Sequence, residues 1–398
     1  MSSLWLPGMD PLRPIPTGKT LAIYFTEAFL PAMVERRLSR DRIGELEQAV
    51  HRWNWWCTEG CNPKDRTSRP VLADITPPRL TEFKKAALGA ELPGRDGKLR
   101  VVSPRSLNKT LQALEQILSA AVEDGTLDEA RGMMRIRKVE QPAQIGKLVM
   151  SDAQLGRLME AAADATWPYR TTAGQAIEAP LFWQAAIALF STYGMRTQDL
   201  VRYDQRMMPI RWGGIFPAGL SPAEDGTLES SYGWIAWVPN KTRSRKVFSM
   251  CLPLTKCTAY WLDQWRTSCG RVSDSDPVFG MPNTKDSFYD QWSRIVTAAD
   301  VRPKPRVAFD DNGNVQKQDR EFKIKHLRCT AGTRADEHGA TLGYENLGRW
   351  VTGHVSNDVF NRHYRSQEKP IMRTLESLPM PAEFTPTGTG GGLRVFAG

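Results

Sequence analysis

Residues 322–366 read FKIKHLRCTAGTRADEHGATLGYENLGRWVTGHVSNDVFNRHYRS and hold four of the five histidines of the chain. Lys325 and Arg328 lie three residues apart at the start of a predicted helix, so both side chains can face one ligand, whereas His326 points elsewhere. A Lys and an Arg placed in this way can hold two oxygens of a phosphate group. A solvated basic helix start explains these two residues equally well when they are taken alone. The same stretch also carries His354, His363 and Tyr364.

The bulk composition is that of a globular protein with an anionic partner. The 398 residues are enough for two domains, and the formal net charge of +9 favours DNA, RNA or an anionic membrane as partner. No run of eighteen apolar residues and no charged-then-apolar leader occur, which predicts no membrane span, no secretory signal and a cytoplasmic location. Cys57 and Cys61 have only His51 as a further metal ligand nearby, so neither a metal site nor a cofactor is expected.

Apolar residues recur at helical spacing through much of the first part of the chain. Helices are predicted over residues 21–29, 41–57, 78–88 and 103–125, the last opened by Ser103-Pro104, with a loop over residues 89–100. These predictions give a flexible lead-in over residues 1–17, an all-helical module over residues 18–138 and a linker over residues 139–150.

The second part of the chain mixes helices with a short β-rich region. Helices are predicted over residues 152–163, 181–193, 258–265 and 287–299, and a hairpin is predicted from the β-rich runs at 234–238 and 247–252. The fold class expected is therefore mainly α with a small antiparallel β-sheet. The second domain spans residues 151–378. A short helix is predicted at 371–378, and the Pro-, Thr- and Gly-rich tail over 379–398 is predicted to be disordered.

Two further groups of basic residues lie in this second domain. Arg196 begins a helix directly after Gly194, and Asp199 is three residues on, within reach for an orienting ion pair. A surface Arg beside a helix-start Asp explains that pair better when it is taken alone. The predicted hairpin tip carries Lys241, Arg243, Arg245 and Lys246, which track a phosphate backbone or form a solvated patch. A phosphate-binding site is favoured because all these basic residues, together with the histidines and Tyr364 of residues 322–366, fall within one predicted domain.

Taken in chain order, this set resembles the tyrosine recombinase (phage integrase) family. The matching residues are Gly194-Met195-Arg196-Thr197-Gln198-Asp199-Leu200, Lys241 in a hairpin, Lys325-His326-Leu327-Arg328, Gly353-His354 and His363-Tyr364. The match spans residues 151 to about 366, and the helical module resembles the core-binding domain of that family. Lys325 stands where a His is more frequent. Tyr364 is ten residues beyond His354, where nine is the commoner spacing and would fall on His363.

The resemblance implies a role for each matching residue. Arg196 and Arg328 would clamp the scissile phosphate, with Lys325 at the third phosphate-binding position and Asp199 supporting Arg196. Lys241 would donate a proton to the leaving 5′ oxygen, and His354 would support the phosphate or the proton transfer. Tyr364 would attack the phosphorus. Arg243, Arg245 and Lys246 are expected to contact DNA.

The function expected is therefore site-specific DNA recombination, as by an integrase of a mobile element, through a 3′-phosphotyrosyl intermediate and without metal or ATP. The partner would be double-stranded DNA carrying recombination sites, bound by a homo-tetramer that is a monomer or weak oligomer when free. The need for a directionality factor is left open. A type IB topoisomerase is the nearest alternative, and a catalytically silent DNA-binding accessory protein is the other. The C-terminal helix is expected either to pack on a neighbouring protomer or to belong to the disordered tail.

Overall fold

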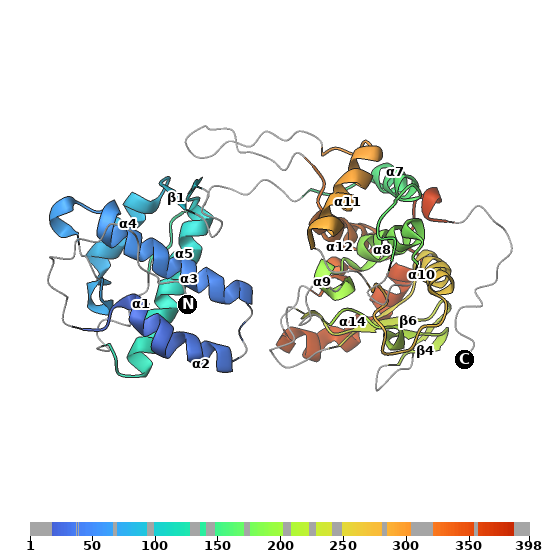
Figure 1. Cartoon of the computed structure of the whole chain (residues 1–398). Coiled ribbons are helices and arrows are strands. Elements are labelled where there is room, and N and C mark those ends of the chain that lie inside the picture. The colour runs from blue at the N-terminus through green and yellow to red at the C-terminus, as the bar shows by residue number, and fades with distance from the viewer. Residues whose placement is uncertain are drawn as a thin grey trace. The chain divides into compact units, whose positions relative to one another are not determined.

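The computed structural model forms two compact units, Met1–Gln144 and Ile145–Gly398 (Figure 1). For residues 357–366 it describes the backbone alone. The described residues are 18–36, 38, 40–66, 70–93, 99–127, 136–140, 148–170, 176–201, 208–222, 228–240, 249–280, 285–303, 321–353 and 357–385.

The N-terminal unit is built mainly of helices, and its predicted helices are present. Their bounds are α1 (Leu21–Tyr24), the π-helical turn η1 (Phe25–Phe29), α2 (Leu30–Glu35), α3 (Arg40–Trp55), the π-helical turn η2 (Trp56–Gly60), the 3₁₀ turns η3 (Pro63–Asp65) and η4 (Leu72–Asp74), α4 (Pro77–Ala87) and α5 (Pro104–Glu123). Trp53 and Trp56 on the α3–η2 run are buried against Phe83 of α4, as expected of core tryptophans.

Helix α5 packs against α3 and begins where the sequence predicts. The hydroxyl of Ser103 accepts a hydrogen bond from the backbone N–H of Ser106 at 3.2 Å. Pro104 occupies the first helical position, where a backbone N–H has no partner within the helix, so proline costs no hydrogen bond there. Leu107, Leu111 and Leu114 recur on one face and are buried. Their burial removes a continuous apolar stripe from water, which is the main source of stability for a helix of this kind.

A small hairpin stands where the sequence predicted only a loop over residues 89–100. Strand β1 (Glu91–Pro93) pairs antiparallel with β2 (Leu99–Val101), and Leu92 lies opposite Arg100. Leu92 is buried, whereas Val101 is exposed. The loop prediction was wrong because three-residue strands are too short to display the alternation that identifies a strand.

The C-terminal unit is organised around α8 (Ala179–Tyr193), which packs against α7 (Asp152–Ala162), α10 (Lys256–Cys269) and α12 (Ile324–Thr341) (Figure 1). Nearly all residues of α8 are buried, because its sequence is apolar on every side. Helix α7 begins at a capping box in which Ser151 and Gln154 satisfy each other's backbone N–H groups.

Small antiparallel sheets and further helices complete this unit, so the fold is mainly α with minor antiparallel β-structure, as predicted. The sheet has the strand order β3 (Ile215–Phe216), β6 (Trp234–Trp237) and β7 (Met250–Pro253), and β4 (Gly219–Leu220) pairs with β5 (Glu229–Ser230). The remaining elements are α9 (Thr197–Leu200), η5 (Trp212–Gly214), α11 (Lys285–Ala298), α13 (Leu347–Val351), α14 (Asn357–Glu376) and η7 (Ala382–Phe384).

The predicted hairpin is present as the β6–β7 pair, with Trp237 opposite Met250 at its distal end. Its basic tip, residues 241–248, lies outside the described residues. None of the helices within the described ranges is long and apolar enough to cross a membrane.

The C-terminal region differs from the prediction in two respects. A single helix, α14, runs from Asn357 to Glu376 through Pro370, in place of a separate short helix over residues 371–378. Ile371 and Leu375 on this helix are buried in the core of their own unit, so the apolar face that was expected to pack on a neighbouring protomer is already covered.

Residues 379–385 are ordered, contrary to the disorder predicted from Pro379 onward. Phe384 is buried, and the indole N–H of Trp261 donates to its carbonyl oxygen at 3.0 Å. Arg334 of α12 donates to the carbonyl of Pro379 and pairs with Asp152 of α7 at 3.0 Å. Composition misled the prediction because one buried aromatic and one buried Arg anchor a segment that is otherwise rich in Pro and Thr.

Candidate active site

The start of α12 positions the first of the predicted site residues. The ring Nδ1 of His326 accepts the backbone N–H of Lys323 at 2.9 Å, and the ring is buried against Phe322. His326 therefore caps the helix and, as predicted, does not share the face of Arg328. Lys325 lies in the first turn with an exposed side chain, one turn before Arg328.

Arg328 joins three segments that are far apart in the sequence. Its Nη1 donates to the carbonyl of Gly194, which is 134 residues away, and its Nη2 donates to the carbonyl of Thr352, which is 24 residues away. Gly194 ends α8 two residues before Arg196, and Thr352 follows α13 two residues before His354. One half-buried guanidinium thus holds together the backbone next to two other members of the predicted site.

Gly194 is required at this junction for two reasons. Its φ of +58° lies in the left-handed region that glycine adopts without steric cost. A Cβ atom at this position would also lie 2.8 Å from Cγ2 of Thr352 and 3.3 Å from Cγ of Arg328. The absence of a side chain at position 194 therefore lets this backbone lie against Thr352 and Arg328.

Helix α13 brings Thr352 to this junction by packing closely on α12. A carboxylate oxygen of Asp336 on α12 accepts the backbone N–H of Gly348 at 2.7 Å. The hydroxyl of Thr352 donates to the carbonyl of Gly348 at 2.6 Å, which extends the last turn of α13. These bonds fix the carbonyl of Thr352 that Arg328 binds.

The predicted ion pair between Arg196 and Asp199 is present. Nη1 of Arg196 lies 3.8 Å from Oδ2 of Asp199, whose side chain is only 1% exposed, while the Arg196 side chain is 22% exposed. The same oxygen accepts the backbone N–H of Arg196 at 3.2 Å. Within the described part of the chain the Arg196 side chain makes this ion pair and no hydrogen bond, so its donors remain available to a ligand.

Asn240 is a site residue that sequence reasoning missed. Its backbone N–H donates to Oδ1 of Asp199 at 2.8 Å, and its carboxamide donates to the carbonyls of Gln198 at 2.6 Å and Met208 at 3.1 Å. The residue stands directly before Lys241. Its place at the end of a β-rich run was visible in the sequence, but Asn there is typical of any turn.

The charges of this junction favour an anion. Burial, and then the positive charge of Arg196, lower the pKa of Arg328 to about 10, while the Asp199 carboxylate acts in the opposite direction. The positive charges of Arg196 and Arg328 therefore oppose each other, and the Asp199 carboxylate partly offsets this effect. An anion bound beside both would favour their charged forms.

Arg196, Asp199 and Arg328 are described and lie at one junction. The positions of the other side chains named below stay predictions. Lys241, Arg243, Arg245, Lys246 and His354 lie outside the described residues. The backbone of Tyr364 lies in α14, a helix that packs against α12, α13 and β7, and its side chain is outside the described part.

Among the described residues, no group of three His, Cys, Asp or Glu side chains is placed to hold a metal ion. The thiol of Cys61 donates to the carbonyl of Cys57 at 3.5 Å. Burial raises the pKa of the Cys57 thiol, which disfavours the thiolate that a metal would need.

No protein-family model matches the sequence, and no curated protein matches it at a significant level. Solved structures do match. A lambda integrase dimer bound to a COC′ core site has a TM-score of 0.50 and 12% identity, over 87% of this chain and 77% of that one. Lambda integrase (75–356), also bound to a COC′ core site, has a TM-score of 0.49 and 12% identity, over 85% of this chain and 96% of that one. The XerH site-specific recombinase bound to difH substrate has a TM-score of 0.45 and 16% identity, over 84% of this chain and 80% of that one.

The match at a TM-score of 0.50 shows a likeness in fold. The family resemblance groups Arg196 with Arg328, and in this fold Arg328 bonds to the carbonyl of Gly194, two residues before Arg196. The chain therefore has the fold of the tyrosine recombinases.

Proposed function

We propose that this chain is a site-specific DNA recombinase that cleaves and rejoins strands through a 3′-phosphotyrosyl intermediate. The observation that carries the proposal is the bridge made by Arg328 between the carbonyls of Gly194 and Thr352, beside Arg196. It fixes one guanidinium next to another in a place where a phosphodiester can be held. The lambda integrase structure with the same fold is itself bound to a core site.

Two fixed guanidinium groups suit this reaction because its transition state spreads negative charge over the phosphate oxygens. Arg presents its donors in a rigid fork that matches two such oxygens. Each preorganised donor of this kind contributes roughly 3 kcal/mol to the stability of the transition state. Asp199 holds Arg196 in place without a tight bidentate bond, so the fork of Arg196 can turn to the phosphate.

The remaining steps are assigned to predicted residues. The phenol oxygen of Tyr364 attacks the phosphorus, and the bond from phosphorus to the 5′ oxygen breaks. A phenol with a pKa of about 10 is a weak nucleophile at neutral pH, so the nearby guanidinium charges favour its ionised form. Lys241 gives a proton to the leaving 5′ oxygen, and His354 supports the phosphate. Attack by another 5′ hydroxyl reverses the sequence and joins the strands, with no metal and no ATP.

Covalent capture tests this proposal. Purified protein is incubated without metal or ATP with nicked duplexes taken from its own genomic neighbourhood, and SDS-resistant adducts are mapped by mass spectrometry. We expect an adduct at Tyr364 that Tyr364→Phe abolishes while duplex binding is kept. Tyr344→Phe is the matched control, because the hydroxyl of Tyr344 accepts a bond from Arg373 at 3.1 Å on the surface and takes no part in the proposed site.

Other outcomes identify the alternatives. An adduct that survives Tyr364→Phe would assign the nucleophile elsewhere. Rapid relaxation of any supercoiled plasmid would favour a type IB topoisomerase, and duplex binding without any adduct would favour a DNA-binding accessory protein. We further propose that the active assembly is a homo-tetramer on two DNA sites, which sizing of the complex on a synthetic four-way junction would test.

A further inference from the structure

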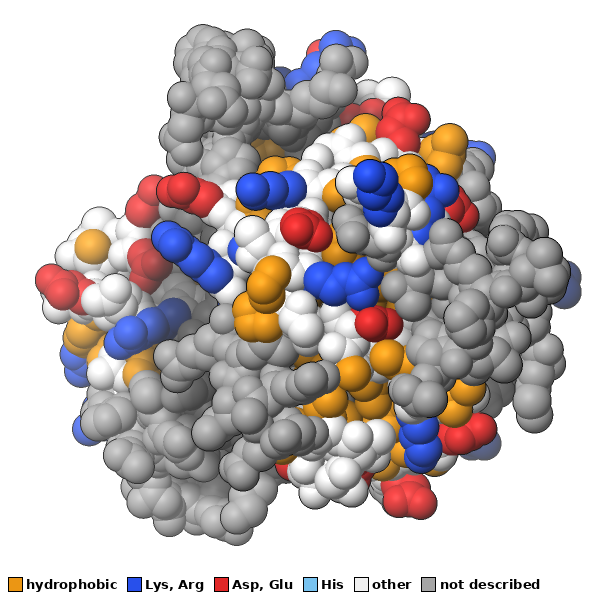
Figure 2. Space-filling view, turned by 90° about the vertical axis from the view of Figure 1, so that its left-hand side faces the viewer, with side chains coloured by type: hydrophobic (Ala, Val, Ile, Leu, Met, Phe, Trp, Pro, Cys, Tyr) orange, Lys and Arg blue, Asp and Glu red, His pale blue; other side chains and the backbone are white. Residues whose placement is uncertain are grey.

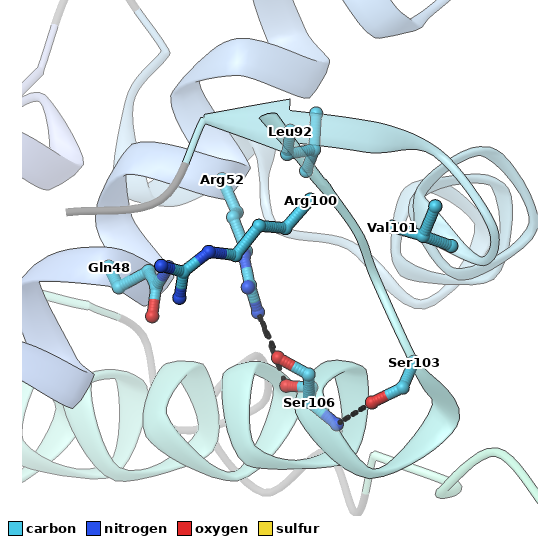
Figure 3. A pocket seen from close by; sticks show the side chains of 7 residues that line it. All are labelled: Gln48, Arg52, Leu92, Arg100, Val101, Ser103 and Ser106. Atoms are coloured by element: carbon cyan, nitrogen blue, oxygen red, sulfur yellow. Dashed lines mark hydrogen bonds between the residues drawn. The ribbon is translucent and has the colours of Figure 1, made fainter. Parts of the chain in front are cut away.

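A pocket of about 280 Å³ lies in the N-terminal unit between α3, the first turn of α5 and the β1–β2 hairpin (Figure 3). Arg52 extends from α3 to Ser106 on α5, and Arg100 extends from β2 toward Gln48 on the opposite wall. The pocket is far in sequence from every residue assigned above.

Arg52 is held along one edge of its guanidinium only. Its Nη1 donates to the hydroxyl of Ser106 at 3.0 Å, to the carbonyl of Ser106 at 3.3 Å and to the hydroxyl of Thr110 at 2.7 Å. Within the described residues Nη2 makes no hydrogen bond, and Nε is enclosed without a partner. Nη2 is therefore the guanidinium nitrogen of Arg52 that is left to donate to a ligand.

Arg52 also has no countercharge among the described residues, since no carboxylate lies within ion-pair distance of it. Burial alone lowers the pKa of Arg52, with no carboxylate to offset it. Arg42 on the same helix is different, because its guanidinium pairs with Glu45 at 2.9 Å and bonds to Gln116 at 2.6 Å. A half-buried cation without a countercharge is costly unless a ligand supplies the opposite charge.

Charge does not identify a binding surface on the face shown in Figure 2. On the face shown in Figure 2, the Lys and Arg side chains of the described residues alternate with Asp and Glu. The pocket is distinct because two arginines line it and no acidic residue does. Its rim carries the exposed apolar residue Val101 of β2, at 62% exposure. Such a rim suits a ligand with an anionic group and an adjoining apolar surface, as in a sugar–phosphate backbone.

We propose that this pocket binds a phosphate of the DNA backbone away from the scissile position, and this inference rests on DNA being the partner in the proposed function. The phosphate places an oxygen at Nη2 of Arg52, with Arg100 and Gln48 on its other side. The deoxyribose next to it packs on Val101. Such a contact is independent of base sequence and sets the register of the N-terminal unit on the duplex.

The test measures duplex binding by the full chain with fluorescence anisotropy between 50 and 200 mM NaCl. We expect Arg52→Gln to weaken binding roughly tenfold and to lower the slope of log K against log salt by about one, the loss of one phosphate contact. Arg52→Lys keeps the charge but not the planar guanidinium that bonds to α5 through Nη1 and presents Nη2 to the phosphate, and we expect it to recover only part of the affinity. Arg42→Gln is the matched control: it removes the same charge from the same helix, and we expect its slope to stay at the wild-type value.

Circular dichroism and thermal melting establish which variants are folded. If Arg52→Gln does not fold, Arg100→Gln replaces it, because that change leaves the bonds of Arg52 to α5 intact. Wild-type affinity and slope in the folded variants would overturn the pocket assignment, and an adduct at Tyr364 in the same preparations would leave the proposed function standing. Absence of both duplex binding and adduct in the wild-type protein would instead reject the proposed function, and the DNA assignment of the pocket with it.

Discussion

Asp199 accepts the backbone N–H of Asn240 at 2.8 Å, although the two residues are 41 positions apart. The other oxygen of the same buried carboxylate faces Arg196. One carboxylate therefore fixes both Arg196 and the residue that directly precedes Lys241. If Lys241 is the general acid, the distance from the phosphate clamp to the proton donor depends on this carboxylate and on the side-chain bonds of Asn240.

Asn240→Ala tests that link. It removes the carboxamide bonds to Gln198 and Met208 but keeps the backbone bond to Asp199. We expect strand cleavage to slow by roughly 10²-fold, the cost of a displacement of about 1 Å in a catalytic group, with duplex binding unchanged. The rate of adduct formation on a nicked duplex measures this.

A substrate with sulfur in place of the leaving 5′ oxygen separates positioning from general structural damage. A thiolate leaves without a proton, so it needs no general acid. We expect this substrate to restore the rate of Asn240→Ala and of Lys241→Ala to that of the wild-type protein. A rate that stays low on the sulfur substrate would mean that Asn240 supports the fold of the site and not the proton donor.

Arg328→Lys tests the bridge at the centre of the site. An ammonium cannot reach both the Gly194 and Thr352 carbonyls, so one acceptor loses its partner. We expect the free energy of unfolding to fall by about 2 kcal/mol and adduct formation to slow by roughly 10²- to 10³-fold. Denaturant unfolding and the capture assay measure the two effects. Arg349→Lys, a change of the same kind at an exposed position over Trp350, should alter neither. If the folded variant formed the covalent adduct at the wild-type rate, Arg328 would support the fold and not the reaction.

The sequence predicted those parts of the site that depend on near neighbours. The Arg196–Asp199 pair follows from a spacing of three residues at a helix start. In the same way, Gly194 predicts where α8 stops, and Ser103 predicts where α5 of the N-terminal unit begins. These features are local, so residue type and spacing are enough to find them.

The bonds of Arg328 and Asn240 could not be predicted in the same way. Their acceptors are mostly backbone carbonyls, which every residue carries, and the segments concerned meet only in the folded chain. The C-terminal tail was misjudged for a related reason. Its composition favours disorder on average, but the position of Phe384 in the core depends on a cavity that other elements build.

Phe384→Ala tests the importance of that anchor. The ring is fully buried, so we expect its removal to lower the free energy of unfolding by about 3–5 kcal/mol. Phe384→Leu keeps most of the volume and should cost less than about 1.5 kcal/mol. Equal, small losses in both variants, measured by urea denaturation, would show that the tail detaches without loss of the core.

Gly194→Ala tests whether close approach and backbone conformation both require a glycine beside Arg328. The left-handed φ costs about 1 kcal/mol for alanine, and the contact with Cγ2 of Thr352 adds an overpacking cost of about 1–3 kcal/mol. Thr352→Ser removes that methyl group and keeps the hydroxyl that bonds to Gly348. In a double-mutant cycle, we expect Thr352→Ser to restore the unfolding free energy that Gly194→Ala loses through overpacking, but not the part lost through backbone strain. The two changes should therefore couple favourably by about 1 kcal/mol or more. Additive losses would mean that backbone strain accounts for the whole effect and that Thr352 moves aside without cost.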